Sequence, residues 1–311
     1  MILCVNANAA IDKTVVVPGF HLNGIQRPEL VRSSPGGKGC NVARALKRLG
    51  GEPVVTGWVG GHAGAFIEEG LQAEGIGTAF VKVPFESRTC LSIIDPQGPS
   101  LTELYERGEA VSAADVAKLV DAFGQIVGRF EAVTLSGSLP PGAPPDLYAT
   151  LIRSAHTAGV QVLLDSSGVG LAQGLPARPD VVKPNVHEFE ELTGLTLSTP
   201  EAVAVAAREW SALMGCRMIV SMGSEGAVAV AEGGAWLVTP PAIELVSAVG
   251  SGDSLVAGSI LGLTRGEALP TAVARGVAAG AANALSLGAA VFTLDAFHDL
   301  HTRTTVRALS V

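Results

Sequence analysis

Short apolar runs rich in β-branched residues alternate along the chain with longer stretches in which apolar side chains recur at helical spacing. Five of these runs are predicted to be buried strands, at residues 53–59, 132–136, 160–165, 181–183 and 218–221. A repeated strand–helix–strand order favours a mostly parallel sheet that is covered by helices on both faces. The pattern therefore predicts an α/β fold.

Two regions depart from this order, because their strands alternate polar and apolar residues and are joined by turns without a helix. One comprises residues 14–20 and 29–33, and the other comprises residues 80–83, 89–95 and 100–105. We expect a small separate β-sheet formed by about residues 12–34 and 80–107. No repeat, low-complexity tract or linker divides the chain, so a single domain over residues 1–311 is expected.

Residues 276–294 form the longest uncharged stretch, which is nearly as long as a membrane span. It consists mostly of Ala and Gly and contains Asn283 and Ser286, so its transfer into lipid is too weakly favourable for a span. We predict a buried helix followed by a strand, and no membrane association. The opening run Met-Ile-Leu-Cys-Val-Asn has no basic segment, which argues against a secretory signal and favours a cytoplasmic location.

The composition fits a soluble enzyme and does not choose among enzymes. With 311 residues, 48% of them hydrophobic, the chain can bury a large core. A formal net charge of -8 argues against nucleic-acid binding, so an anionic ligand must be met by a local group of Lys and Arg side chains. The cysteines at 4, 40, 90 and 216 have no CxxC or metal-ligand spacing and are predicted to be reduced thiols.

A glycine-rich turn at residues 248–254, Ala-Val-Gly-Ser-Gly-Asp-Ser, leads directly into an apolar helical stretch. Gly250 and Gly252 allow backbone N–H groups to approach an anion closely, and a helix N-terminus adds unpaired donors. Asp253 would repel a phosphate at this place unless it accepts the proton of an attacking hydroxyl. The alternative is that Asp253 is the N-cap of an ordinary helix.

A second turn, Ser-Pro-Gly-Gly-Lys-Gly-Cys-Asn at residues 34–41, also precedes an amphipathic helical stretch. It is not a P-loop, because Arg32 stands where that motif needs glycine and Gly39 stands where it needs Ser or Thr. Lys38 and Asn41 are candidates for contact with a polar, anionic ligand. The alternative is a solvated lysine on a flexible turn.

Three further motifs lie between these turns: Leu-Ser-Gly-Ser-Leu-Pro-Pro-Gly at 135–142, Val-Lys-Pro-Asn-Val-His-Glu at 182–188 and Ser-Met-Gly-Ser-Glu-Gly at 221–226. In this order the five motifs resemble the PfkB family of sugar kinases, and most of all its branch of 1-phosphofructokinases and tagatose-6-phosphate kinases. The resemblance covers nearly the whole chain and implies a ribokinase-like fold, with a mostly parallel central sheet flanked by helices. It also implies that the small β-sheet is a lid over the sugar site and the contact of a homodimer.

The same resemblance implies ATP as phosphoryl donor and Mg²⁺ as cofactor. Gly250, Ser251 and Gly252 would bind the migrating phosphoryl group through backbone N–H groups, with Asp253 as the base. Lys183 would reach a donor phosphate from the end of its strand. The nucleotide would also contact a glycine-rich turn and a residue near the adenine, which are Ser221, Gly223, Gly226 and Asn283.

Asn185 and Glu188 have the spacing of the family's Asn-x-x-Glu motif. The resemblance implies that they order magnesium and its waters around the phosphates, which suits oxygen ligands. The alternative is a capping pair at a helix N-terminus, without a metal.

For the acceptor, Asp12 is expected to hold sugar hydroxyls together with Gly37, Lys38 and Asn41, and Ser138 is a further family-like contact. Three arginines lie in or beside the segments of the small sheet, namely Arg27, Arg88 and Arg107. If they converge, they would neutralise a phosphate already on the sugar, since Arg suits bidentate phosphate contacts. This favours a sugar phosphate over a free sugar; the alternative is three scattered surface arginines.

The chain departs from the family pattern at Ala9, where proline is common, at Tyr105 and Arg107, and at Ser251. These departures leave fructose 1-phosphate and tagatose 6-phosphate both open, with 6-phosphofructokinase or another PfkB sugar kinase as further alternatives. A dinucleotide-dependent oxidoreductase is disfavoured, because neither turn has the G-x-G-x-x-G spacing. A non-catalytic sugar-phosphate sensor would be expected to lose Asp253 or the glycines, and both are present.

Overall fold

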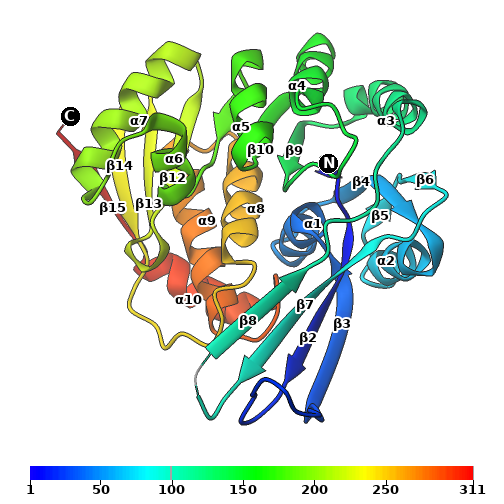
Figure 1. The fold of residues 1–311 in the computed structure, drawn as a ribbon. Helices are drawn as coiled ribbons and strands as arrows, with labels where there is room; N and C mark the ends of the chain where they lie inside the picture. Colours follow the sequence, from blue (N-terminus) through cyan, green and yellow to red (C-terminus); the bar gives the residue numbers. More distant parts are fainter. Residues whose placement is uncertain (99, 311) are drawn as a thin grey trace.

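The computed structural model describes residues 1–98 and 100–310, and within them the strands form two sheets (Figure 1). The parallel part of the larger sheet comprises β1 (Ile2–Asn6), β4 (Pro53–Gly60), β5 (Gly77–Thr78), β6 (Val81–Val83), β9 (Ala132–Ser136), β10 (Gln161–Asp165), β11 (Val181–Val182) and β12 (Arg217–Ser221). Its antiparallel edge comprises β13 (Ala227–Ala231), β14 (Gly234–Thr239) and β15 (Thr305–Leu309). The order is β15-β14-β13-β12-β11-β10-β9-β1-β4-β5, with β6 also paired to β4. The predicted mostly parallel sheet is thus confirmed.

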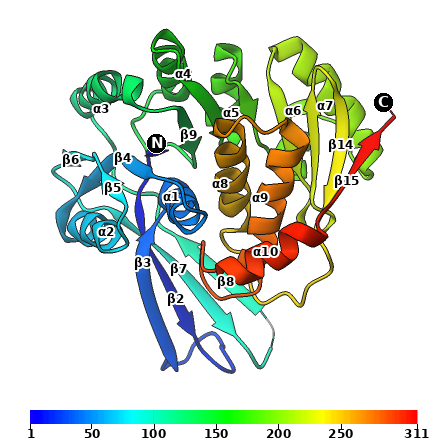
Figure 2. The ribbon, with the colours of Figure 1, turned by 180° about the vertical axis from the view of Figure 1, so that it is seen from behind.

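Helices cover both faces of this sheet, as predicted (Figures 1 and 2). One face packs against α1 (Lys38–Arg48), α2 (Gly61–Ala73), α8 (Ser251–Thr264), α9 (Leu269–Ala284) and α10 (Leu294–Arg303). The other packs against α3 (Ala113–Ile126), α4 (Leu147–Thr157), α5 (Gly168–Gly174), α6 (Val186–Thr193) and α7 (Pro200–Met214). Strand residues divide between the two cores by alternation: Cys4 belongs to the first core and Val5 to the second.

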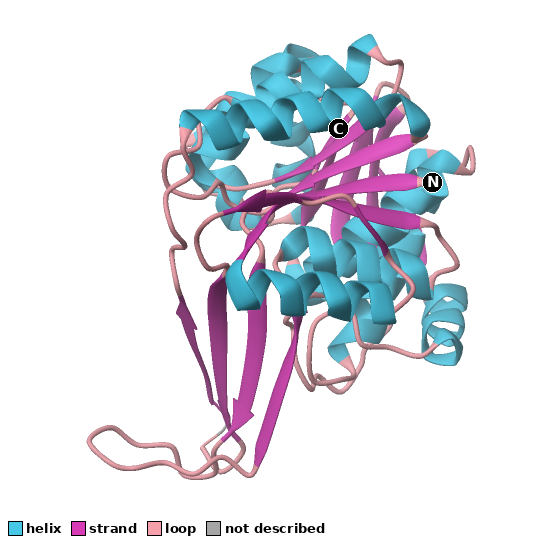
Figure 3. Cartoon of the chain, turned by 90° about the vertical axis from the view of Figure 1, so that its right-hand side faces the viewer, coloured by secondary structure: helices cyan, strands magenta, loops and turns pink. Residues whose placement is uncertain are grey.

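The smaller sheet consists of β2 (Ala10–Val16), β3 (Leu30–Gly36), β7 (Arg88–Asp95) and β8 (Ser100–Tyr105), in the order β3-β2-β7-β8. It extends away from the main body (Figure 3). The separate small sheet was predicted, but residues 80–83 were wrongly included, because β6 pairs in parallel with β4 of the large sheet. Strand β3 also runs further than predicted, so Gly37 alone separates it from α1.

The uncharged stretch at 276–294 forms the buried end of α9, as predicted, but the strand expected after it is absent from the described residues. Ala290 has φ 57°, and the N–H of Val291 donates to Oδ1 of Asn283 at 3.2 Å instead of joining a strand ladder. The segment therefore turns back toward α9 before α10 begins. In the described part of the chain, no helix combines the length and apolar character that a bilayer crossing requires.

Candidate active site

The carboxyl ends of β9, β10 and β11 meet the N-termini of α1 and α8 at one edge of the large sheet. In open parallel sheets, this edge is where ligands bind. Asp165 ends β10, Lys183 follows β11, Lys38 begins α1, and Asp253 lies in the first turn of α8. The fold therefore gathers two carboxylates and two ammonium groups around the two predicted glycine-rich turns.

The turn before α8 is built for close backbone contacts. Gly250 is the N-cap, with φ 80°, and a Cβ at this position would lie 2.6 Å from Cα of Ala289. The N–H groups of Gly252 and Asp253 have no acceptor within the helix, and no side chain caps it. The N–H of Ser251 donates to the carbonyl of Ala248 at 3.1 Å, so of the three expected donors Ser251 already has an acceptor within the protein.

Asp253 lies beneath this turn, with only 6% of its surface exposed. Nδ2 of Asn41 donates to its Oδ2 at 2.9 Å. Burial raises the pKa of Asp253 to about 6, although the charge of Lys38 opposes the rise. Because Gly250 is the N-cap and the Asp253 side chain does not cap the helix, the alternative of an ordinary capping aspartate is excluded.

Asp165 joins the two lysines and was missed by the sequence analysis. Its Oδ1 lies 3.0 Å from Nζ of Lys183 and 3.5 Å from Nζ of Lys38. Burial raises the pKa of Asp165, but Lys183 and Lys38 outweigh it and hold the pKa below its ordinary value. Asp165 in turn raises the pKa of Lys38, so this pair stays charged at neutral pH. The available signal was a carboxylate at the carboxyl end of a predicted parallel strand.

Lys183 is placed where its ammonium can meet an anion at the start of α8. A Cβ added to Gly252 would lie 4.0 Å from Nζ of Lys183, and the side chain is buried against Asp165. The backbone donors of α8 and the ammonium group therefore face one small region, as expected for a phosphate site.

The turn before α1 places Asp12 and Asn41 close together. Asp12 lies on β2 opposite Ser34 of β3, and a Cβ on Gly36 would lie 2.1 Å from its Cγ. Burial raises the pKa of Asp12, while the Gly37 N–H, Arg44 and the Asn41 amide oppose the rise. Gly37 has φ 90°, which favours glycine.

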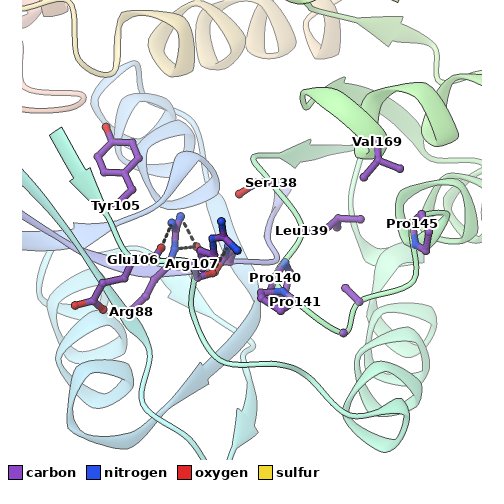
Figure 4. A pocket seen from close by; sticks show the side chains of 13 residues that line it. Arg88, Tyr105, Glu106, Arg107, Ser138, Leu139, Pro140, Pro141, Pro145 and Val169 are labelled. Atoms are coloured by element: carbon purple, nitrogen blue, oxygen red, sulfur yellow. Dashed lines mark hydrogen bonds between the residues drawn. The ribbon is translucent and has the colours of Figure 1, made fainter.

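A pocket of about 530 Å³ opens between the base of the small sheet and the loop after β9. It is lined by Asn8, Arg88, Tyr105, Glu106, Arg107, Ser138, Leu139, Pro140, Pro141, Gly142, Ala143, Pro145 and Val169. Figure 4 shows the two arginines on one side and the apolar residues, including Leu139 and Val169, on the other. A Cβ on Gly137 would lie 3.5 Å from Cβ of Lys38, so the pocket adjoins the lysine cluster.

The expected convergence of three arginines is correct for only two of them. Arg88 and Arg107 line the pocket, whereas Arg27 lies in the loop between β2 and β3 at the end remote from α1. The Arg88 guanidinium donates to the carbonyls of Glu106 at 2.8 Å and Asn8 at 3.2 Å. These contacts orient it at the pocket rim.

Asn185 and Glu188 form a reciprocal capping box at the start of α6. The Glu188 N–H donates to Oδ1 of Asn185 at 2.8 Å, and the Asn185 N–H donates to Oε2 of Glu188 at 2.8 Å. The capping alternative thus describes their direct contacts. Glu188 nevertheless contributes to raising the pKa of Lys38, so it faces the same cluster. No group of three or more His, Cys, Asp or Glu residues suited to a metal occurs in the described residues.

The turn after β12 contains Ser221, Gly223 and Gly226. The Ser221 N–H donates to the Pro184 carbonyl at 3.1 Å, which holds this turn beside the start of α6. Gly226 has φ 93°, and a Cβ there would lie 2.0 Å from the carbonyl oxygen of Val238. Glycine is therefore required at position 226 by packing against β14, whether or not this turn binds a ligand.

Asn283 was expected near the adenine, and its side-chain hydrogen bonds in the structure are all with the protein. Its side chain is 0% exposed, and Nδ2 donates to the Val249 carbonyl at 2.8 Å and to Oγ of Ser251 at 3.2 Å. Since its Oδ1 accepts from Val291, all its bonds hold protein segments together. Asn283 fixes the glycine-rich turn before α8.

A buried carboxylate beside two ammonium groups and a helix N-terminus is an arrangement suited to phosphoryl transfer. Residues 3–295 match the pfkB family of carbohydrate kinases, and the chain belongs to this family. It is thus an ATP-dependent phosphotransferase that acts on a carbohydrate. The resemblance inferred from the five motifs is confirmed.

Individual relatives agree with this family assignment. The chain is 39% identical over 266 residues to the 1-phosphofructokinase of Rhodobacter capsulatus, covering 85% of this chain and 84% of that protein. Phosphofructokinase-2 from Escherichia coli, solved with fructose-6-phosphate, superposes with a TM-score of 0.89 at 29% identity, covering 97% of this chain and 98% of the relative. Arabidopsis thaliana ribokinase superposes with a TM-score of 0.78 at 20% identity, covering 96% and 98%, which confirms the ribokinase-like fold.

Proposed function

We propose that this chain is a 1-phosphofructokinase, which transfers the γ-phosphoryl group of ATP to fructose 1-phosphate and yields fructose 1,6-bisphosphate. The observation that carries the chemistry is the buried Asp253 at the start of α8, next to unpaired backbone donors and Lys183. The choice of acceptor rests on the similarity to the Rhodobacter capsulatus 1-phosphofructokinase and on the two arginines of the pocket.

In the proposed reaction, the acceptor hydroxyl oxygen bonds to the γ-phosphorus, and the bond from that phosphorus to the β,γ-bridging oxygen breaks. Asp253 accepts the hydroxyl proton, and ADP leaves. Donors at the start of α8 and the ammonium of Lys183 stabilise the charge on the transferring group. Lys38 lies between Asp165 and the acceptor pocket and orients the reacting ends.

Asp12, Gly37 and Asn41 would hold the sugar at the base of the small sheet, with Ser138 on the opposite wall. Ser221, Gly223 and Gly226 would border the nucleotide through the turn after β12. Asn283 supports this site from behind, because its amide fixes the turn that carries the phosphate donors.

Mg²⁺ fits the residues present, because it binds through one or two carboxylates together with substrate phosphates rather than in a closed protein cage. Glu188, with Asn185 beside it, would order the ion through water, and the bound ion would neutralise phosphate charge. Asp165 has a second buried oxygen, Oδ2, without a hydrogen-bond partner, so the site has unused acceptor capacity.

A second acceptor is favoured by one specific observation: the Escherichia coli relative was solved with fructose-6-phosphate. The phosphate of that sugar lies at the opposite end from that of fructose 1-phosphate. Arg88 and Arg107 would bind a remote phosphate in either case, so the pocket rim alone does not separate them. Tagatose 6-phosphate is the third acceptor to test.

The small sheet is proposed to pair with that of a second chain. Its edge strands β3 and β8 carry exposed apolar side chains at Leu30, Val31, Leu101, Leu104 and Tyr105. Open strand edges with apolar residues favour association, and a two-fold axis closes such an interface. The Escherichia coli relative has been solved as a tetrameric inhibited form.

The four buried free cysteines suit the proposed cytoplasmic location.

The deciding experiment measures ADP release with ATP, Mg²⁺ and a panel of acceptors. Fructose 1-phosphate, fructose 6-phosphate, tagatose 6-phosphate, free fructose, ribose and adenosine are compared by kcat/KM. The proposal predicts the highest value for fructose 1-phosphate. A preference for fructose 6-phosphate would replace the proposed acceptor, and ADP release without dependence on any sugar phosphate would refute the proposal.

A further inference from the structure

Arg44 lies in α1, three residues after Asn41, and only 5% of its surface is exposed. Its Nη1 donates to Oδ1 of Asn41 at 3.2 Å. Its Nε donates to Oε2 of Glu74 at 2.6 Å, and its Nη2 donates to Oε1 of Glu74 at 3.1 Å and to the Pro35 carbonyl at 2.8 Å. One guanidinium thus connects the residue that bonds Asp253 with β3 and the end of α2.

These contacts determine which way the Asn41 amide points. A guanidinium can only donate hydrogen bonds, so the atom of Asn41 that faces Arg44 must be the oxygen. The NH₂ group then faces Asp253 and can donate to its carboxylate. If the amide rotated by half a turn, its oxygen would face the carboxylate, which would oppose the ionised form and accept from the protonated form.

We propose that Arg44 is a positioning residue that keeps the NH₂ group of Asn41 facing Asp253. This inference rests on the proposed function, in which Asp253 is the base. With the NH₂ group in this position, Asp253 stays ready to accept a proton at neutral pH. Arg44 does not contact the reacting atoms in this arrangement. It acts through Asn41, which also lies close enough to Asp12 to affect that carboxyl.

The other groups that face Asp253 are accounted for. Lys38 comes from α1, Asp165 from β10 and Lys183 from the end of β11. Helix α9 also packs on α8, but its single charged residue, Arg275, is paired with Glu267. Strand β9 contributes no titratable residue. A change at Arg44 therefore reaches Asp253 through the one neutral group in the set, Asn41.

The test is the pH dependence of kcat on the sugar phosphate. Removing Arg44 alone would leave Glu74 without its partner, so Arg44→Met is combined with Glu74→Gln. We expect the acid limb of the profile to move up by about one pH unit, so that kcat falls by about fivefold at the wild-type midpoint and by about tenfold well below it. The loss should disappear at pH values well above the limb. A purely structural role would lower kcat equally at every pH.

Three variants serve as controls. Glu74→Gln keeps the bond from Arg44 to Asn41 and should keep the wild-type profile. Arg44→Lys keeps a donor beside Oδ1 of Asn41 and should restore the profile, even if its melting temperature falls with the loss of the Glu74 fork. Arg48→Met removes another arginine of α1, which bonds the Phe292 carbonyl and not Asn41, and should change nothing in the profile.

A folded double variant with the wild-type profile, or with the same loss at every pH, overturns the inference. If the double variant does not fold, Arg44→Gln decides by the same two outcomes, since its amide tolerates either orientation of Asn41. A wild-type chain without sugar-phosphate-dependent ADP release would refute the proposed function, and the inference with it. An active wild-type chain with unaffected variants would refute the inference alone.

Discussion

Nδ2 of Asn41 lies 2.9 Å from Oδ2 of Asp253, although the two residues are 212 positions apart in the sequence. This bond joins the first turn of α1 to the first turn of α8. The two glycine-rich turns therefore belong to one site, in which the expected acceptor-binding helix directly contacts the expected base.

Asp253→Asn tests the base. The amide keeps the size of the side chain but cannot accept the hydroxyl proton, so kcat should fall by about 10²- to 10⁴-fold. Nucleotide binding, measured by calorimetry, should be retained or tightened, because a negative charge beside the phosphates is lost. Asp146→Asn, at the exposed start of α4, is the matched control. Retention of most of kcat in Asp253→Asn would rule out the proposed base.

The raised pKa of Asp253 makes a prediction about pH. The carboxyl group is protonated below its pKa of about 6 and cannot accept a proton there, so kcat should rise through this region and level off above it. The native chain also binds this proton more tightly than the unfolded chain does, so the carboxylate lowers stability as the pH rises from about 4 to above 6. Asp253→Asn should accordingly melt at a higher temperature than wild type at pH 8. A wild-type kcat that does not change between pH 5 and pH 8 would contradict the assignment.

The two pocket arginines should affect the acceptor rather than the nucleotide. Arg107→Ala and Arg88→Ala should each raise KM for the sugar phosphate by about tenfold or more, with KM for ATP unchanged, because a charged hydrogen bond to the phosphate is lost. Arg107 is the cleaner test, since Arg88 also bonds the carbonyls of Asn8 and Glu106. Arg153→Ala, on the surface of α4, is the control. If neither variant changed the kinetics of the acceptor, this pocket would not be the binding site of the sugar's phosphate.

Asn283→Leu should loosen the turn before α8. The substitution removes the bonds to Val249, Ser251 and Val291 and leaves a partly buried carbonyl and N–H without their protein partner, at a cost of up to about 1–3 kcal/mol each. We expect a lower melting temperature together with a reduced kcat, measured against Ser286→Ala in the neighbouring turn. A variant that is destabilised yet fully active once folded would show that the turn does not depend on this amide.

The proposed dimer can be tested at the edge of the small sheet. Leu104 in β8 is 56% exposed, and a charge there should oppose the pairing of two edges. Leu104→Glu should therefore be a monomer in light scattering, whereas the wild-type chain should be a dimer. Leu213→Glu places the same charge on the exposed surface of α7 as a control. A wild-type chain that is already monomeric and fully active would reject the interface.

The sequence predicts five of the parallel strands, β4, β9, β10, β11 and β12, to within one residue, because buried apolar runs between helices leave little choice of structure. It does not predict β13 to β15. Strand β15 is separated from its partner β14 by more than sixty residues, so local pattern carries no sign of their pairing. Residues 80–83 were misassigned for the same reason, since a three-residue strand can pair with any nearby edge and only the folded chain decides which.

In the site, too, some residues could be predicted from local sequence and others could not. Glycine turns and Asp253 stand out locally, because unusual backbone angles and a carboxylate beside an anion site need special residues. The contacts of Asp165, Arg44 and Asn283 depend on which segments meet in space. A buried ion pair or an amide that joins two loops has no local spacing to reveal it.

Gly37 is the only residue between the end of β3 and the start of α1, and the Arg44 side chain crosses this junction to the Pro35 carbonyl. The small sheet and the first turn of α1 are thereby directly connected. A tilt of the sheet about Gly37 would move Lys38 and Asn41 with it. If the sugar binds at the base of this sheet as proposed, its binding would also reposition the groups at the start of α1, because only Gly37 separates the sheet from that helix.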